Sequence, residues 1–271
     1  MAFYPTLQKS WRAFLNNIKS VIMIIVIDII FFVCMAFVYA KVWQNAMVHI
    51  NAILDIAGMS MEELAGAQTE AQLSSLMAKQ AEFMAHYRQI SYYVGMLLVA
   101  LLVFWCVFQG ISWLTTHNII KGKKYNAMKY FGRFSLLSII WWAAFILLMG
   151  GAIRMSMYSS MAVLPFFSRL AARTLVLLLL FVLFSVSYTS YALVPEHSIR
   201  RVFREIVAAF RKKYKAIVPA YLFMAAVLVG EYFFFMRAFA LGGYAPAVFA
   251  VVIIFPTIAW TRFYAITALE K

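Results

Sequence analysis

The stretch of sequence that decides the fold is residues 20–42, SVIMIIVIDIIFFVCMAFVYAKV. Apart from Asp28 and Lys41, it carries no charged side chain. A helix needs about 20 mainly apolar residues to cross a hydrocarbon core roughly 30 Å thick, and this stretch meets that length. Its apolar run is longer than the core of about 7–15 residues in a secretory signal, so we predict a retained membrane span.

The rest of the chain shares this character. Of its 271 residues, 65% are apolar and 13% are charged, whereas a soluble domain has about 45–50% apolar and about 25% charged residues. The apolar segments lack the alternation of barrel strands, so they should form helices, which pair their backbone groups internally. We predict an all-α fold, a polytopic membrane bundle of about six transmembrane helices in one domain over 1–271. The six predicted spans are residues 20–42, 91–115, 132–153, 171–194, 216–236 and 245–268.

Basic residues are concentrated on one side of this predicted topology. The formal net charge is +14, and 17 of the 24 Lys and Arg residues precede span 1, separate spans 2 and 3, separate spans 4 and 5, or lie near the chain end. We call this the basic side. By the positive-inside rule it is cytoplasmic, with both termini there, in a plasma (cytoplasmic) membrane.

The same charges indicate partners on the basic side. Each cation near an anionic leaflet contributes about 1 kcal/mol of attraction, so we expect anionic lipids as partners and no nucleic acid. Residues 202–210 place apolar and basic side chains on opposite helical faces, as in a helix lying in the interface. Basic amphipathic stretches also precede spans 1 and 3. Either the chain repeats one helical-hairpin unit three times, or these basic flanks follow simply from the positive-inside rule. The predicted lipid-facing residues are Arg200, Arg201, Arg204, Arg211, Lys212 and Lys213.

The long segment 43–90 between spans 1 and 2 also has a helical pattern. Its polar residues are good helix formers, and it contains no proline. Gly58 offers a helix stop, and Ser60 with Glu63 forms a capping-box signature for a new helix. We therefore predict an outward-facing hairpin of two packed helices, at about 44–57 and 61–88. It is either a surface for a partner protein or simply self-packed.

Several polar residues lie where the bilayer makes them costly. A charged side chain facing lipid at the bilayer centre costs roughly 2.5–3.5 kcal/mol, so Asp28, Glu231 and Arg262 should face the bundle interior. Asp28 and Arg262 lie at matching depths in the half of the bilayer nearer the basic side, and we predict that they pair. Pro256 should bend or break span 6 beside Arg262. The predicted cluster in this half is Asp28, Gln109, Ser185, Thr189, Thr257, Thr261 and Arg262, and in the outer half Glu231 lies level with Arg154 and Arg173.

Methionine and histidine on the outward-facing side suggest a weaker hypothesis. Met47 and His49, like Met84 and His86, form M-x-H pairs, and thioether with imidazole suits Cu(I). Residues two positions apart on a helix point to different faces, however, so we predict no metal and no cofactor. The chain contains no nucleotide-binding, serine-hydrolase or zinc-protease motif, so we expect no enzyme, with an intramembrane acid at Asp28 or Glu231 as the alternative.

Two functional hypotheses therefore remain from different classes. In the first, which the sequence favours, the polar cluster lines a vestibule, and the protein is a transporter or channel-like unit for an ion or small polar solute. In the second, the cluster only fixes helix packing, and the protein is a non-catalytic membrane subunit or scaffold. The scaffold would bind a partner protein through 43–90 and lipid through its basic helices.

Overall fold

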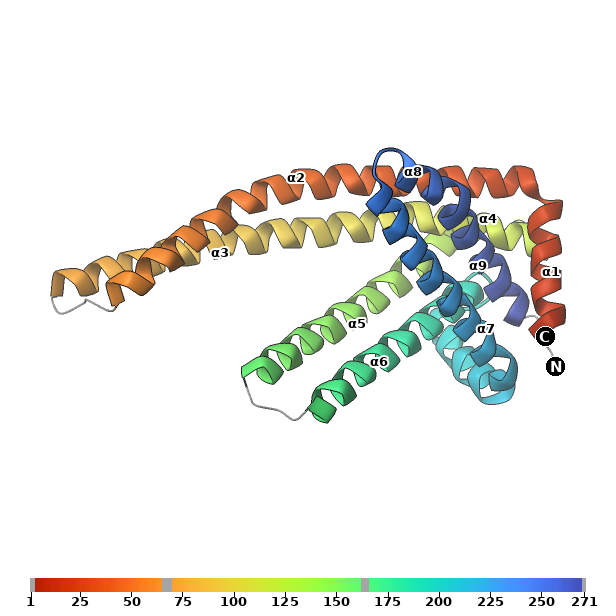
Figure 1. The fold of residues 1–271 in the computed structure, drawn as a ribbon. Helices are drawn as coiled ribbons and strands as arrows, with labels where there is room; N and C mark the ends of the chain where they lie inside the picture. The colour runs from red at the N-terminus through yellow and green to blue at the C-terminus, as the bar shows by residue number, and fades with distance from the viewer. Residues whose placement is uncertain (1–2, 65–69, 162–165, 270–271) are drawn as a thin grey trace. The chain divides into compact units, whose positions relative to one another are not determined.

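A computed structural model describes residues 3–64, 70–161 and 166–269 (Figure 1). Within these ranges the chain forms helices and short connections but no strand, which confirms the predicted all-α fold. Two of the helical segments, η1 and η2, are single π-helical turns. The elements are α1 (Phe3–Asn16), α2 (Ile18–Leu64), α3 (Glu70–Phe104), η1 (Trp105–Gln109), α4 (Gly110–Lys121), α5 (Ala127–Met161), α6 (Phe166–Leu193), α7 (Ile199–Leu241), α8 (Ala245–Phe249), η2 (Ala250–Ile254) and α9 (Phe255–Leu269).

Six helical segments within the described ranges are long and apolar enough to cross a membrane. Their large apolar side chains remain widely exposed: Leu147 is 77% and Phe37 74% accessible. Lipid is the solvent in which exposed apolar side chains are favourable. A helix can be surrounded by lipid because its backbone polar groups are already paired within the helix. The chain is a multi-pass integral membrane protein. The six segments are Ile18–Ile56, Ala78–Lys121, Ala127–Met155, Arg173–Leu193, Ile217–Ala240 and Ala245–Leu269, one for each predicted span.

The structure divides into two compact units. The first, here called the bundle, contains residues 1–30 and 105–271, and the second, here called the hairpin, contains residues 31–104. Within the bundle, α9 is the central helix, in contact with α1, α4, α6 and α7. Every residue from 259 to 268 is buried. A helix that is buried on all sides can place a polar side chain only where other helices supply its partners.

The bundle also contains the three basic amphipathic stretches. The first is α1, which ends at Asn16 before α2 begins. Its Trp11 and Phe14 pack edge-to-face against aromatic rings of α9. The third is the first part of α7, which a non-helical backbone at Lys213 separates from the membrane span. The second stretch runs without a break into the span of α5. The three stretches therefore share amphipathic character but differ in how each joins its span.

The hairpin unit consists of the later part of α2 and all of α3, which run side by side (Figure 1). The predicted helix stop at Gly58 and restart at Ser60 are wrong, because α2 continues to Leu64. A glycine inside a helix costs only about 1 kcal/mol relative to alanine, which is too little to end a helix that no proline interrupts. The turn itself, 65–69, lies outside the described residues.

Candidate functional site: a buried charge cluster

Three helical elements of the bundle supply the charged and amide side chains of the candidate site. Asp28 lies in the first part of α2, Gln109 is the last residue of η1, and Arg262 lies in α9. Span 6 is not broken as predicted, since the chain stays helical from Ala245 to Leu269; the irregularity near Pro256 is the π-helical turn η2, which immediately precedes Phe255. The π-helical turn η1 was not predicted. Close packing follows it, because a Cβ on Gly110 would lie 2.7 Å from the ring of Phe131.

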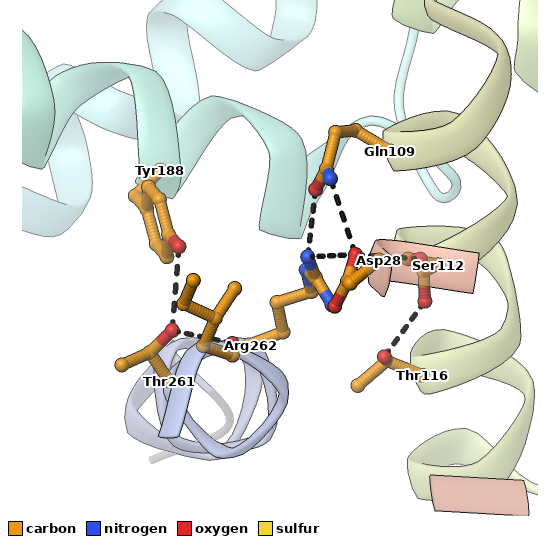
Figure 2. Close-up of polar contacts among 8 residues, drawn as sticks. Asp28, Gln109, Ser112, Thr116, Tyr188, Thr261 and Arg262 are labelled. Carbon is orange, nitrogen blue, oxygen red and sulfur yellow. Dashed lines mark hydrogen bonds and ion pairs between the residues drawn. The ribbon is translucent and has the colours of Figure 1, made fainter. Parts of the chain in front are cut away.

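Arg262 and Asp28 form a two-pronged ion pair at the centre of the site (Figure 2). The guanidinium donates from Nη1 to Asp28 Oδ2 at 2.8 Å and from Nη2 to Asp28 Oδ1 at 2.9 Å. Nη2 also donates to Gln109 Oε1 at 2.6 Å, while Gln109 Nε2 donates to Asp28 Oδ1 at 3.1 Å. The hydroxyl of Ser112 donates to the same Oδ1 at 3.3 Å. The predicted pairing of Asp28 with Arg262 is thus present.

The cluster is closed to solvent. Asp28 is 0% exposed, Arg262 1% and Gln109 4%. Both carboxylate oxygens and both terminal guanidinium nitrogens have partners, which is the condition under which a buried ion pair is tolerated. Among the polar atoms of Asp28, Gln109 and Arg262, Nε of Arg262 is the one without a hydrogen-bond partner in the described part of the chain. In this conformation the cluster therefore holds helices together and offers a solute no vacant polar group on the carboxylate.

The structure brings only some of the predicted cluster together. Thr261 adjoins Arg262, but its hydroxyl bonds Ile258 O and faces the hydroxyl of Tyr188 at 3.3 Å (Figure 2). Ser185 and Thr189 bond carbonyls of their own helix, and Thr189 also contacts the hydroxyl of Tyr221. Hydropathy predicts how deep in the membrane such residues lie but not which face of their helix they occupy. It therefore cannot distinguish a side chain that bonds Arg262 from a hydroxyl that bonds a carbonyl of its own helix.

Comparison with family models, with curated proteins and with solved structures finds no match. Function must therefore be inferred from this chain's own contacts.

The predicted charge group in the outer half does not assemble. Glu231 forms no ion pair with Arg154 or Arg173 among the described residues, and both arginines are exposed. The carboxyl of Glu231 is instead hydrogen-bonded by Thr257 of α9. Thr257 was predicted in the other cluster, and the depth argument therefore assigned it the wrong partner.

In the hairpin, the two histidines of the copper hypothesis meet. His49 Nδ1 and His86 Nδ1 lie 2.9 Å apart, so one ring donates a hydrogen bond to the other. The ring of Tyr93 stacks on His49, and Glu82 Oε1 lies 4.0 Å from His86 Nε2. Met84 is exposed and Met47 partly buried. No group of three or more His, Cys, Asp or Glu side chains suited to a metal occurs in the described residues.

A polar contact group on the basic side was missed by the sequence analysis. Lys121 Nζ lies 3.2 Å from Glu196 Oε1, and the hydroxyl of Tyr125 donates to the same oxygen at 3.1 Å. Partial burial raises the pKa of Tyr125 to about 12, with the negative charge of Glu196 adding to the effect. Partial burial alone would raise the pKa of Glu196, but the hydrogen bonds and the charge of Lys121 outweigh it and lower that pKa. The group fastens the end of α4 to the α6–α7 connection.

The predicted lipid-facing basic residues are solvent- or headgroup-accessible, with one exception. Lys213, at the kink of α7, donates to the carbonyl of Leu269 at 2.9 Å and so caps the end of α9. A cation is favourable there because helix C-termini carry partial negative charge. The five exposed residues are Arg200, Arg201, Arg204, Arg211 and Lys212.

Proposed function

We propose that this membrane protein is a non-catalytic membrane subunit or scaffold, which presents its hairpin to a partner protein and binds anionic lipid through its basic helices. The single observation that carries the proposal is the closed Asp28–Arg262–Gln109 cluster. A transport site needs groups that exchange protein partners for solute or water. Here both oxygens of the Asp28 carboxylate are already bonded to other helices of the bundle.

The length of the hairpin supports a surface outside the bilayer. Its arms are residues 31–64 of α2 and the 35 residues of α3, each about 50 Å long at 1.5 Å per residue. The hydrocarbon core is roughly 30 Å thick, so part of each arm must extend beyond it. Val48 is 65% and Leu54 62% exposed on one arm, and Tyr87 is 55% exposed on the other. These three positions lie within the long apolar helices but outside the predicted spans 20–42 and 91–115. If they extend beyond the bilayer, their exposed apolar side chains form a surface for a partner protein.

An apolar groove beneath α7 supports the lipid contact. Phe203, Ile206, Val207 and Phe210 form one wall of a groove of about 570 Å³ against α6. The exposed arginines of the same helix lie on its other face. An acyl chain in the groove and an anionic headgroup near these arginines would satisfy both surfaces.

A site-specific photo-cross-linker tests the scaffold proposal. Placed at Leu54 or Tyr87, it should yield a discrete protein adduct in intact membranes. Placed at Leu147, which is exposed within a membrane span, the same group should yield lipid adducts only. The proposal fails if the hairpin positions give no protein adduct at native expression while the purified protein mediates solute flux across liposome membranes.

A second function, transport, is favoured by one specific observation. The π-helical turns η1 and η2 interrupt the helices that carry Gln109 and Arg262. Such turns are rare and occur frequently at functional sites, where they permit local rearrangement. On this hypothesis the ion pair opens in another conformation, and liposome flux should fall in Gln109→Ala but not in Ser185→Ala. A protein that is inert in liposomes with both anionic and neutral lipid would exclude it.

A further inference from the structure

Glu231 is a second intramembrane carboxyl group, and its setting differs from that of Asp28. It lies in the membrane span of α7 and is 9% exposed. Thr257 supplies one hydrogen bond, but Oε2 has no hydrogen-bond partner in the part of the chain that the structure describes. A buried acceptor without a partner is costly, so an unpaired carboxyl oxygen within a membrane span points to a ligand.

Glu231 lines a slot of about 470 Å³, which is within the range of small-molecule sites. All the other residues that line the slot are apolar or glycine. One wall comes from α7 and the other from α8 and η2, whose π-helical turn carries Ile253. The remaining lining residues are Ala226, Val227, Gly230, Phe234, Phe249 and Ile253.

The slot opens toward the lipid phase. Its rim residues Phe234 and Ile253 are 67% and 40% exposed, and both lie within membrane spans. A molecule that enters from the bilayer must itself be apolar, and the only polar group that it meets along the lining of the slot is Glu231. A metal cation would need several oxygen ligands, which this lining does not supply.

We propose that the slot beside Glu231 binds a lipophilic alcohol, whose hydroxyl donates to Oε2 while its hydrocarbon body fills the apolar walls. This chemistry satisfies the unpaired oxygen without bringing a charge into the membrane. It also places the apolar part of the ligand against apolar side chains, where van der Waals packing favours it, since lipid tails are as apolar as these walls.

A hydrophobic carbodiimide provides a direct test, because it attacks carboxyl groups in their neutral form. Without a cationic partner in an apolar setting, the neutral acid is the less costly form of Glu231. Its proton then lies on the oxygen that contacts Thr257, which leaves Oε2 as the carbonyl oxygen that accepts a hydrogen bond. The acid proton passes to a carbodiimide nitrogen, the carboxyl oxygen adds to the central carbon, and acyl migration gives a stable N-acylurea with no leaving group. We expect this adduct at Glu231 by peptide mass mapping. Asp28 should remain unmodified because it is paired with Arg262 and fully buried.

Protection by a ligand then tests the hydroxyl. Hexadecanol should slow modification of Glu231 at least tenfold more than hexadecyl methyl ether, which has the same chain but no donor. Gly230→Leu should abolish protection, since a side chain there would fill the slot and an added Cβ meets no atom within 4 Å. Gly150→Leu is the matched control, as its Cβ also meets no atom within 4 Å and Gly150 lies in α5.

Three results would overturn the proposal. They are modification of Asp28 in preference to Glu231, equal protection by the alcohol and its ether, and undiminished protection in a folded Gly230→Leu variant. The comparison of alcohol with ether uses the unaltered protein, so it decides the matter even if the variant does not fold.

Discussion

Arg262 of the central helix and Asp28 of α2 are 234 positions apart in the chain, yet their charged groups meet through two hydrogen bonds of 2.8 and 2.9 Å in a site that solvent does not reach. Gln109 bonds both partners and completes the cluster. A buried pair of this kind contributes less to net stability than its geometry suggests, because both ions must be desolvated. Removing one member is costly, since the other is left unpaired.

Gln109 should be important for stability through its bond to Arg262. Gln109→Ala removes the acceptor 2.6 Å from Nη2 and should lower the free energy of unfolding in detergent by about 1–3 kcal/mol. Ser185→Ala is the control, because that hydroxyl bonds only the Phe181 carbonyl of its own helix. Equal thermal stability of the two variants would show that the bond from Gln109 to Arg262 does not stabilise the protein.

The membrane orientation can be tested with single cysteines in a background lacking Cys34 and Cys106. An impermeant thiol reagent should label a cysteine at Asn51 in intact cells and cysteines at Asn126 or Ser198 only after lysis. These three positions are exposed, so access rather than burial decides the outcome. Labelling of Asn126 in intact cells would reverse the orientation inferred from the basic residues.

The contact between His49 and His86 should couple the two arms of the hairpin. In a double-mutant cycle with alanine at each position, the coupling energy should be about 0.5–1.5 kcal/mol in favour of the pair. Local hydrogen exchange of the arms measures it, because the hairpin can open without unfolding the bundle. Purely additive effects would show that the two rings merely lie near each other.

The Lys121–Glu196–Tyr125 group predicts a pH dependence with a definite sign. Because the folded-state pKa of Glu196 is lowered, its stabilisation is fully present above the ordinary carboxyl pKa of about 4.3 and is lost as the pH falls through the folded value. The difference in melting temperature between the wild-type protein and Glu196→Gln should therefore shrink as the pH is lowered from 6 toward 3. A difference that stays constant over this range would contradict the assignment.

Some features of this fold could be read from hydropathy and charge, and others could not. The six spans and the pairing of Asp28 with Arg262 follow from apolar length and matched depth. The predicted break at Pro256 is absent, and a π-helical turn precedes that proline instead. The turn of the hairpin was misplaced because Gly58 is only a weak helix breaker.

The sequence did not predict which face of a helix a residue occupies or which residues meet across helices. Thr257 bonds Glu231 rather than Arg262, and Glu231 pairs with neither arginine assigned to it. The meeting of His49 with His86 depends on the register of α2 against α3, which no local pattern specifies. The π-helical turn η1 was likewise not predicted, and Gly110, which follows it, lies close to the ring of Phe131.

The central claim is that the ion pair holds the bundle together and does not carry solute. The most direct measurement is the unfolding free energy of Asp28→Asn, Arg262→Gln and the double variant, with hairpin cross-linking as the functional readout. Each single change should cost about 3–5 kcal/mol, and the double change should recover much of that loss together with the cross-link. A single variant that stays as stable as the wild-type protein but abolishes a liposome flux that the wild-type protein shows would contradict the claim.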